Sequence, residues 1–185
     1  FYLLFPIFIV LAWPLGRRRI AALLAVATLL SLAAAHWGAY HKPLATFFLL
    51  PTRAWELGIG ALAAMYLAQN ERPGPGGVAQ ETLAMGGAAM ILSAIVFYDE
   101  STPFPSLYAL VPTLGTALII LFATPATLAG RLLGNRLLVA IGLISFSAYL
   151  WHQPLFAFAR YLAVRPPDAW LMLGLAALSL LLAAF

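Results

Sequence analysis

The stretch best equipped for chemistry is S-F-S-A-Y-L-W-H-Q-P, which begins at Ser145 and lies within a long apolar run. On a helix, Ser145, Tyr149 and His152 follow one another at i, i+4 and i+7, so a hydroxyl, a phenol and an imidazole share one face. Pro154 has no N–H, so the carbonyl of Leu150 loses its helical donor. The sequence therefore predicts a polar helix face beside an opening in the hydrogen-bond ladder.

His152 is a candidate functional residue because of its depth in an apolar segment. A charged group at the centre of a membrane helix costs roughly 2.5–3.5 kcal/mol on insertion scales, so ionisable residues there usually serve a function. A freed backbone carbonyl in the same place must be satisfied by a neighbouring helix, water or a ligand. The alternative interpretation is a neutral histidine that hydrogen-bonds between helices and serves packing alone.

A second polar group lies in the segment R-A-W-E. Arg53 and Glu56 are three residues apart on one helix face, so the arginine can neutralise the carboxylate or hold a second anionic group. Gly60 and Ala64 continue that face with small residues, which permit close helix packing and leave room beside the acid. An interfacial anchor would explain Arg53 and Trp55. It does not explain Glu56, one turn deeper, where a carboxylate needs a partner.

The remaining histidines and the aromatic residues favour simpler roles. His36 and His41 are interpreted as solvated loop histidines rather than ligands. We predict no metal site, because the spacing of these two and His152 does not indicate convergence. The sequence has no cysteine, which excludes disulfides, thiolate metal ligands and a cysteine nucleophile. An interfacial aromatic belt is predicted from Trp37, Tyr40, Phe47 and Phe48.

Composition places the chain in a membrane. Its 185 residues are 64% hydrophobic and 9% charged, and the mean hydropathy is +0.97. Ordinary globular chains carry about 25% charged residues, so most of this surface does not face water. The formal net charge of +4 comes from few residues. Arginines in short loops of a membrane protein set its orientation, and nucleic-acid binding is not expected.

The predicted fold class is an all-α polytopic transmembrane helix bundle with about seven spans. The spans are predicted at residues 1–16, 20–37, 53–69, 81–98, 107–124, 137–162 and 169–185, with the first and last truncated. Connections are predicted at residues 38–52, 70–80, 99–106, 125–136 and 165–168. Because the chain starts at Phe1 and both ends lie in apolar runs, we expect a fragment of a longer protein.

The arginine cluster at residues 17–19 is the strongest orientation signal and is predicted to be cytoplasmic. Glu56 then lies one turn below the outer end of its span. His152 lies about 22 Å above the inner start of its span at ~1.5 Å per residue, so both residues fall in the outer half of a ~30 Å core. We expect the two spans to line one polar cavity open to the outside, with a sugar or water between the side chains.

Three motifs occur in a fixed order: F-Y-L-L-F-P, then R-A-W-E-L-G-I-G-A-L-A-A, then F-S-A-Y-L-W-H-Q-P-L. Together they resemble the acyltransferase-3 family of integral membrane O-acyltransferases, which acetylate lipopolysaccharide O-antigen, peptidoglycan, exopolysaccharides or macrolides. The likeness covers residues 1–185 and corresponds to the later part of the family's ten-helix membrane domain. It implies that the N-terminal helices, with the arginine and the principal histidine implicated in catalysis, precede Phe1. The fragment alone is therefore expected to be inactive.

The resemblance also implies roles for residues that match its motifs. The R-x-W-E-L match supports Arg53 and Glu56, and the Y-L-x-H-x-P match supports His152 and its neighbours. Glu56 and His152 are expected as supporting catalytic residues, which fix a tautomer, relay a proton or line the acceptor site. The expected substrate-binding residues are Arg53, Trp55, Tyr149 and Trp151, of which Arg53 and Tyr149 could stabilise an oxyanion.

The function implied is that of an O-acyltransferase in a bacterial inner membrane. It would move an acyl group, with acetyl expected, from cytoplasmic acetyl-CoA to a hydroxyl of a cell-surface glycan or lipid-linked saccharide. Its partners would be the lipid bilayer, the acyl-CoA and the glycan. One alternative is a secondary transporter, whose sites also combine ionisable residues with proline-broken helices and whose activity depends on ion gradients. A scaffolding subunit is a third possibility, in which Glu56 and His152 would be dispensable.

Overall fold

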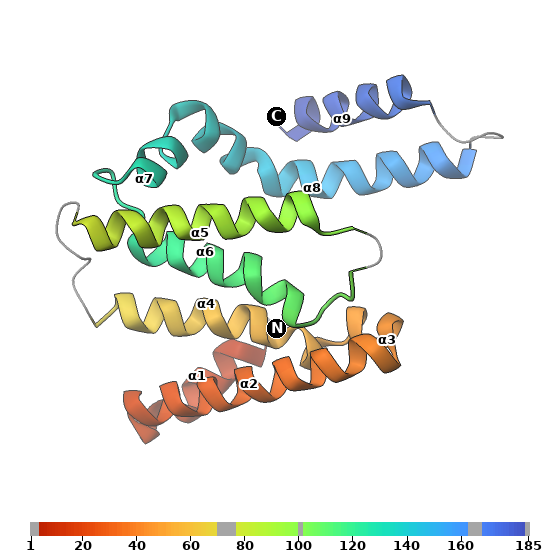
Figure 1. Cartoon of the computed structure of the whole chain (residues 1–185). Coiled ribbons are helices and arrows are strands. Elements are labelled where there is room, and N and C mark those ends of the chain that lie inside the picture. Colours follow the sequence, from red (N-terminus) through yellow and green to blue (C-terminus); the bar gives the residue numbers. More distant parts are fainter. Residues whose placement is uncertain (1–3, 70–76, 100–101, 163–167, 184–185) are drawn as a thin grey trace. The chain divides into compact units, whose positions relative to one another are not determined.

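The computed structural model describes residues 4–69, 77–99, 102–162 and 168–183, and it contains helices and no strands in these ranges (Figure 1). The predicted all-α class is therefore confirmed. In chain order the elements are α1 (Leu4–Ala12), η1 (Trp13–Leu15), α2 (Arg17–His41), α3 (Pro43–Phe48), η2 (Leu50–Thr52), α4 (Ala54–Leu67), α5 (Val78–Phe97), η3 (Leu107–Ala109), α6 (Leu110–Phe122), α7 (Leu128–Leu133), α8 (Arg136–Leu162) and α9 (Ala169–Ala183).

Each predicted span coincides with an apolar helix. Three of them, α2, α5 and α8, are long and apolar enough to cross a membrane. The other apolar helices are shorter and lie at Phe5–Leu15, Ala54–Leu67, Leu107–Phe122 and Ala169–Ala183. The 14 residues of α4 would extend about 21 Å at ~1.5 Å per residue, less than a ~30 Å hydrocarbon core. The helices are consistent with a membrane bundle whose apolar helices differ in length.

The prediction that residues 38–52 and 125–136 form loops is wrong in part. Helix α2 has 25 residues and reaches His41, so both His36 and His41 belong to this helix rather than to a loop. Lys42 then donates its N–H to the Gly38 carbonyl at 2.7 Å, and α3 and α7 fill much of the two predicted connections. Short helices satisfy backbone groups internally, which matters near an apolar phase. Residues 70–76, 100–101 and 165–167, which belong to the other three predicted connections, lie outside the described ranges.

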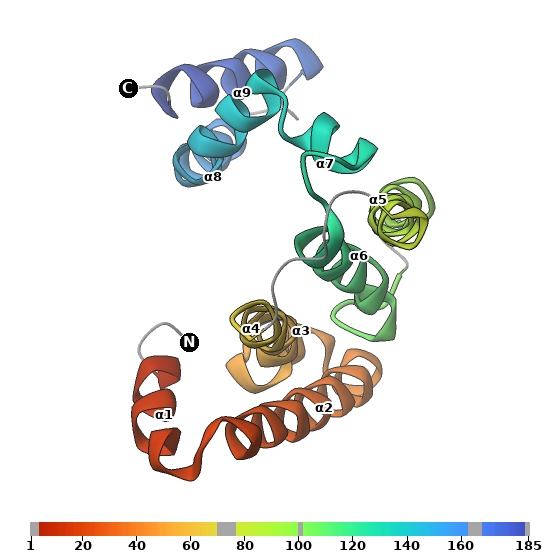
Figure 2. The same ribbon diagram turned by 90° about the vertical axis from the view of Figure 1, so that its left-hand side faces the viewer.

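The chain divides into two units, one ending at Arg131 and the other beginning at Leu132. In the first, α4 packs against α2 and α6, and α6 packs against α5, so α4 lies between an earlier and a later helix (Figures 1 and 2). In the second, α8 packs against α9. The segment that starts with Arg53 is therefore positioned by helices on both of its sides.

Glycines set the closest helix contacts in the first unit. At Gly58 of α4, an added Cβ would collide with the Thr28 hydroxyl of α2. At Gly87 of α5, a Cβ would lie 2.6 Å from the Gly115 carbonyl oxygen of α6. Gly60, predicted both to permit close packing and to leave room, has no atom within 4 Å of such a Cβ. The room is therefore confirmed at Gly60, whereas the close approach to α2 is made at Gly58.

Candidate functional site

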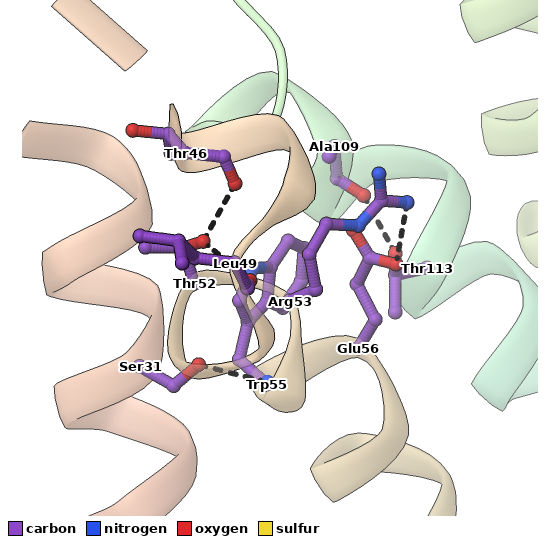
Figure 3. A network of polar contacts seen from close by, with 9 residues as sticks. All are labelled: Ser31, Thr46, Leu49, Thr52, Arg53, Trp55, Glu56, Ala109 and Thr113. Carbon is purple, nitrogen blue, oxygen red and sulfur yellow. Dashed lines mark hydrogen bonds and ion pairs between the residues drawn. The ribbon is translucent and has the colours of Figure 1, made fainter. Parts of the chain in front are cut away.

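Arg53 and Glu56 form an ion pair at the start of α4. Arg53 occupies the N-cap position and Glu56 the first turn, so their separation of three residues brings the side chains together as predicted. The Arg53 Nη2 atom lies 3.2 Å from Glu56 Oε2, with side-chain exposures of 31% and 25% (Figure 3). A carboxylate near a helix N-terminus also interacts favourably with the helix dipole. The pair is therefore fixed by local sequence and only partly solvated.

Two phenylalanines hold the guanidinium of Arg53. Its central carbon lies 5.2 Å from the ring centroid of Phe47 and 5.2 Å from that of Phe104. Cation–π contacts within about 6 Å of a ring centroid are attractive. Phe47 belongs to α3 and was predicted only as part of an aromatic belt. Phe104 lies in the turn before η3, and no sequence signal linked it to Arg53, since tertiary folding alone joins the two.

Glu56 lines a pocket, and its second carboxylate oxygen is unpaired. Oε1 is buried and has no hydrogen-bond partner among the described residues. The pocket encloses about 240 Å³ between α4 and α6. Its lining comprises Glu56, Ile59, Gly60, Pro112, Thr113, Thr116, Ala117 and Ile120. Open space at Gly60 thus lies one turn below a carboxylate oxygen that is free to accept a hydrogen bond.

The two threonines of this pocket make it rich in acceptors. The Thr113 hydroxyl donates to the Ala109 carbonyl at 2.7 Å (Figure 3), and that of Thr116 donates to the Pro112 carbonyl at 2.8 Å. A hydroxyl has one proton to donate and two lone pairs that accept. With both protons committed to the backbone, the threonine oxygens and Glu56 Oε1 are suited to a ligand that donates O–H or N–H groups.

Trp55 anchors the start of α4 in the core. Its side chain is 0% exposed and packs with Ala35 and Ala109, so it does not belong to an exposed interfacial belt. Its backbone N–H donates to Ser31 Oγ at 3.0 Å, and Ser31 in turn donates to the Pro51 carbonyl. Trp55 is not among the residues that line the pocket, and its substrate-binding role stays a prediction.

The polar stretch of the second unit lies on α8, which continues through Pro154 without interruption. His152 is half-buried, its Nδ1 lies 3.3 Å from the Ala148 carbonyl oxygen, and its ring centroid is 5.3 Å from that of Tyr149. Tyr149 is therefore its neighbour on the predicted face. Tyr149 and Trp151 are 59% and 45% exposed. The contact of the His152 imidazole nitrogen is thus within its own helix.

Glu56 and His152 belong to different units of the chain, and the expectation that they line one cavity stays a prediction. Of the other histidines, His41 is exposed and its ring stacks on Trp37 at 4.6 Å. His36 is half-buried, and its ring meets that of Tyr40 edge-on at 5.2 Å. In the described ranges, no three His, Asp or Glu side chains are grouped in a way that could hold a metal ion.

These features define a helical membrane protein with an arginine-held carboxylate beside an acceptor-rich pocket. The chain matches the family model Acyl_transf_3, described as an acyltransferase domain, over residues 1–185, and it belongs to this family. It is similar to "Putative membrane-bound transacylase BcsY" of Komagataeibacter xylinus, with 32% identity over 126 residues. The match covers 68% of this chain and 31% of that protein, so the chain spans about a third of the relative's length. No solved structure matches the chain.

Proposed function

We propose that this chain forms the acceptor-binding part of a multi-pass O-acyltransferase of the bacterial inner membrane. The intact protein moves an acyl group, acetyl in the simplest case, from acyl-CoA to a hydroxyl of a cell-surface glycan or lipid-linked saccharide. Membership of the acyltransferase-domain family over residues 1–185 supports acyl transfer. The nature of the pocket beside Glu56 supports a hydroxyl-bearing acceptor.

The observation that carries the acceptor assignment is the unpaired Oε1 of Glu56. Arg53 holds Oε2, which keeps the carboxylate in one orientation and leaves Oε1 for a ligand. A buried acceptor without a donor loses the free energy of a hydrogen bond, so a ligand hydroxyl would restore it. A saccharide carries several hydroxyls on a compact ring. It therefore complements a small pocket with one carboxylate oxygen and two threonine oxygens.

The reaction requires a hydroxyl oxygen to attack the thioester carbonyl of the acyl donor. A C–O bond forms, the C–S bond breaks, and the hydroxyl proton passes to a base and then to the departing thiolate. A base that works near neutral pH is needed, and histidine has the matching unperturbed pKa. In this proposal the principal histidine precedes Phe1, and Glu56 accepts a hydrogen bond from an acceptor hydroxyl. His152 orients the acceptor or relays a proton, with Tyr149 and Trp151 beside it.

The direct test is Glu56→Gln in the full-length protein. The amide keeps the size of the side chain but removes the charge paired with Arg53 and halves the acceptor capacity. Misplacement of a reacting group by about 1 Å can cost about 100-fold in rate, so we expect a loss of that order. Membrane vesicles supplied with radiolabelled acetyl-CoA and the native envelope glycan would give the rate as label incorporated into alkali-labile ester.

Glu81→Gln provides the matched control. Glu81 lies in the first turn of α5 and accepts the Leu128 N–H at 3.1 Å, outside the pocket. The Glu81→Gln substitution should leave the acylation rate within about twofold of that of the unmodified protein, because surface substitutions of this kind usually have small effects. Both variants should insert into the membrane at the level of the unmodified protein. Full activity of the Glu56→Gln variant would remove Glu56 from the acceptor site.

A further inference from the structure

A groove of about 750 Å³ is lined by residues of α1, η1, α2 and α4 in the first unit. Figure 2 shows how these helices lie in the fold. Ligand pockets in proteins occupy roughly 300–1,000 Å³, so the groove is large enough to hold a ligand. It is separate from the pocket beside Glu56, with which it shares no lining residue. Its walls on α1, η1 and α2 include the apolar side chains of Phe5, Ile9, Trp13, Ile20 and Leu24.

Small residues on α4 keep the groove open. Ala61, Ala64, Met65 and Ala68 all line it, and their spacing of i, i+3, i+4 and i+7 places them on one face of the helix. Because three of the four are alanines, this face fills little of the space opposite α1. Gly16, with φ of 82°, lets the chain change direction between η1 and α2 in a conformation that favours glycine.

One arginine lines the groove, and two more follow it in the sequence. Arg17 lines it and donates from Nη2 to the Met65 carbonyl at 3.5 Å, which is a weak contact. Arg18 and Arg19 follow, and all three side chains are exposed. Within the described ranges the one ion pair is that of Arg53 with Glu56, so no described carboxylate neutralises these guanidinium groups.

An apolar groove with an arginine in its lining matches an anionic amphiphile. Purely apolar cavities do not hold water stably, and acyl chains are the solvent around a membrane helix. Guanidinium groups bind phosphate through short charge-assisted hydrogen bonds, and basic pockets between membrane helices recognise anionic lipid headgroups. We propose that the groove holds an acyl chain of an anionic phospholipid whose phosphate lies against Arg17, Arg18 and Arg19. The proposal does not depend on the acyl-transfer function.

Photolabelling of the full-length protein in liposomes tests this site. The probes are phosphatidylglycerol and phosphatidylcholine that carry the same diazirine-bearing acyl chain. Phosphatidylglycerol should label the peptides spanning residues 4–24 and 61–68 about fivefold more strongly or better, the effect of a single basic residue near an anionic lipid. Equal labelling by the two probes would overturn the proposal, because the arginines would then not select the headgroup.

Charge variants of Arg17, Arg18 and Arg19 separate selectivity for the lipid headgroup from packing of the acyl chain in the groove. Replacement of all three arginines by glutamine should reduce phosphatidylglycerol labelling to the phosphatidylcholine level, whereas replacement by lysine should preserve the preference because it keeps the charge. The lysine variant also keeps the orientation signal of the cluster. A glutamine variant that retains the preference would overturn the proposal.

Filling the groove tests where the chain binds. Ala64→Trp should abolish labelling of these peptides by both probes, and Ala64→Leu, a smaller change that is easier to accommodate, should reduce it. The matched control is Ala27→Trp, since Ala27 is exposed on α2 and does not line the groove. The proposal fails if labelling survives both Ala64 variants. It also fails if neither lipid labels these peptides, which would be the result if another helix fills the groove. Displacement of the label by acetyl-CoA would likewise overturn it.

Discussion

The ion pair of Arg53 and Glu56 has two functions that can be separated. Arg53 compensates a carboxylate that would otherwise lie partly buried without a counter-charge, which is unfavourable. With exposures of 31% and 25%, the pair is partly solvated, so its net contribution to stability is smaller than that of a buried pair. Its second function is orientation, because a guanidinium that lies against Phe47 and Phe104 fixes Oε2 and leaves Oε1 unpaired.

Arg53→Gln should therefore lower acylation about 10-fold or more, and the double variant with Glu56→Gln should be no worse than Glu56→Gln alone. If the arginine acts through the carboxylate, the two losses will not add, and coupling energies between contacting residues typically reach about 0.5–3 kcal/mol. Initial acylation rates of the four proteins, normalised to the amount in the membrane, complete the cycle.

Arg131→Gln is the control for this cycle, since it removes an exposed arginine that donates to the Ala126 carbonyl at 3.4 Å. Arg53→Lys should give an intermediate loss, because lysine keeps the charge but lacks the planar group that stacks on the rings. Strictly additive losses in the double variant would contradict the positioning role and give Arg53 an independent one.

At the level of single residues, the sequence predicted those side-chain contacts that helix periodicity determines. Arg53 and Glu56 are three residues apart on one helix, and so are Tyr149 and His152, and both pairs are neighbours in the structure. Phe104 could not be predicted, because its contact with Arg53 depends on the packing of α4 against α6. The same packing brings Thr113 beside Glu56. The core position of Trp55 could not be predicted for a related reason, since a tryptophan at a helix end suits either an interface or a core.

Among the helices, apolar length was predictable and close packing was not. Every predicted span coincides with a helix, because sustained hydrophobicity requires internal hydrogen bonds in a bilayer. The short α3 and α7 were missed, although Pro43 at the first position of α3 is a typical helix start. Whether Gly58 or Gly60 meets α2 depends on the rotation of α4 about its axis, and small residues on several faces left that rotation undetermined.

These two glycines should respond differently to the same substitution. Gly58→Ala places a Cβ against the Thr28 hydroxyl, so α2 and α4 must separate, and overpacking of this kind costs about 1–3 kcal/mol. Gly60→Ala enters open space and should be neutral or stabilise by roughly 0.5–1 kcal/mol, because alanine favours the helix. Apparent Tm values of the full-length variants in one detergent, followed by tryptophan fluorescence, should fall for the first variant alone.

The reverse order of Tm values, or two equal values, would show that α4 presents a different face to α2. A double variant, Gly58→Ala with Thr28→Ala, separates steric conflict from a general effect at Gly58. Removal of the threonine hydroxyl relieves the collision, so this variant should recover part of the lost Tm. No recovery would assign the loss to another neighbour of Gly58.

On the scale of the first unit, the helices alternate in direction and bring their connections to two opposite ends (Figure 1). At one end, Arg17 of α2 contacts the Met65 carbonyl of α4, and Gln80 of α5 donates to the Phe122 carbonyl of α6 at 3.1 Å. At the other end, the Tyr98 hydroxyl donates to the Tyr108 carbonyl at 2.9 Å. This alternation is the one that successive membrane spans would require.

The arginine cluster at residues 17–19 predicts that its end of this unit faces the cytoplasm, because basic residues are retained on that side. Single cysteines at Lys42 and Gly77 test the direction, since each position is exposed and they follow α2 and precede α5 at opposite ends. A Cβ at Gly77 has no atom within 4 Å, and Lys42 is a solvated N-cap, so neither change should disturb packing.

In intact cells, with any cysteine outside this chain replaced, an impermeant maleimide should label Lys42→Cys and leave Gly77→Cys unlabelled until the membrane is opened. Labelling of Gly77→Cys alone would reverse the orientation and place the pocket beside Glu56, which lies toward the Lys42 end of α4, on the cytoplasmic side. An acceptor reached from outside the cell would then be excluded, because a bilayer would separate it from the carboxylate. Equal labelling of both positions would contradict the alternating topology itself.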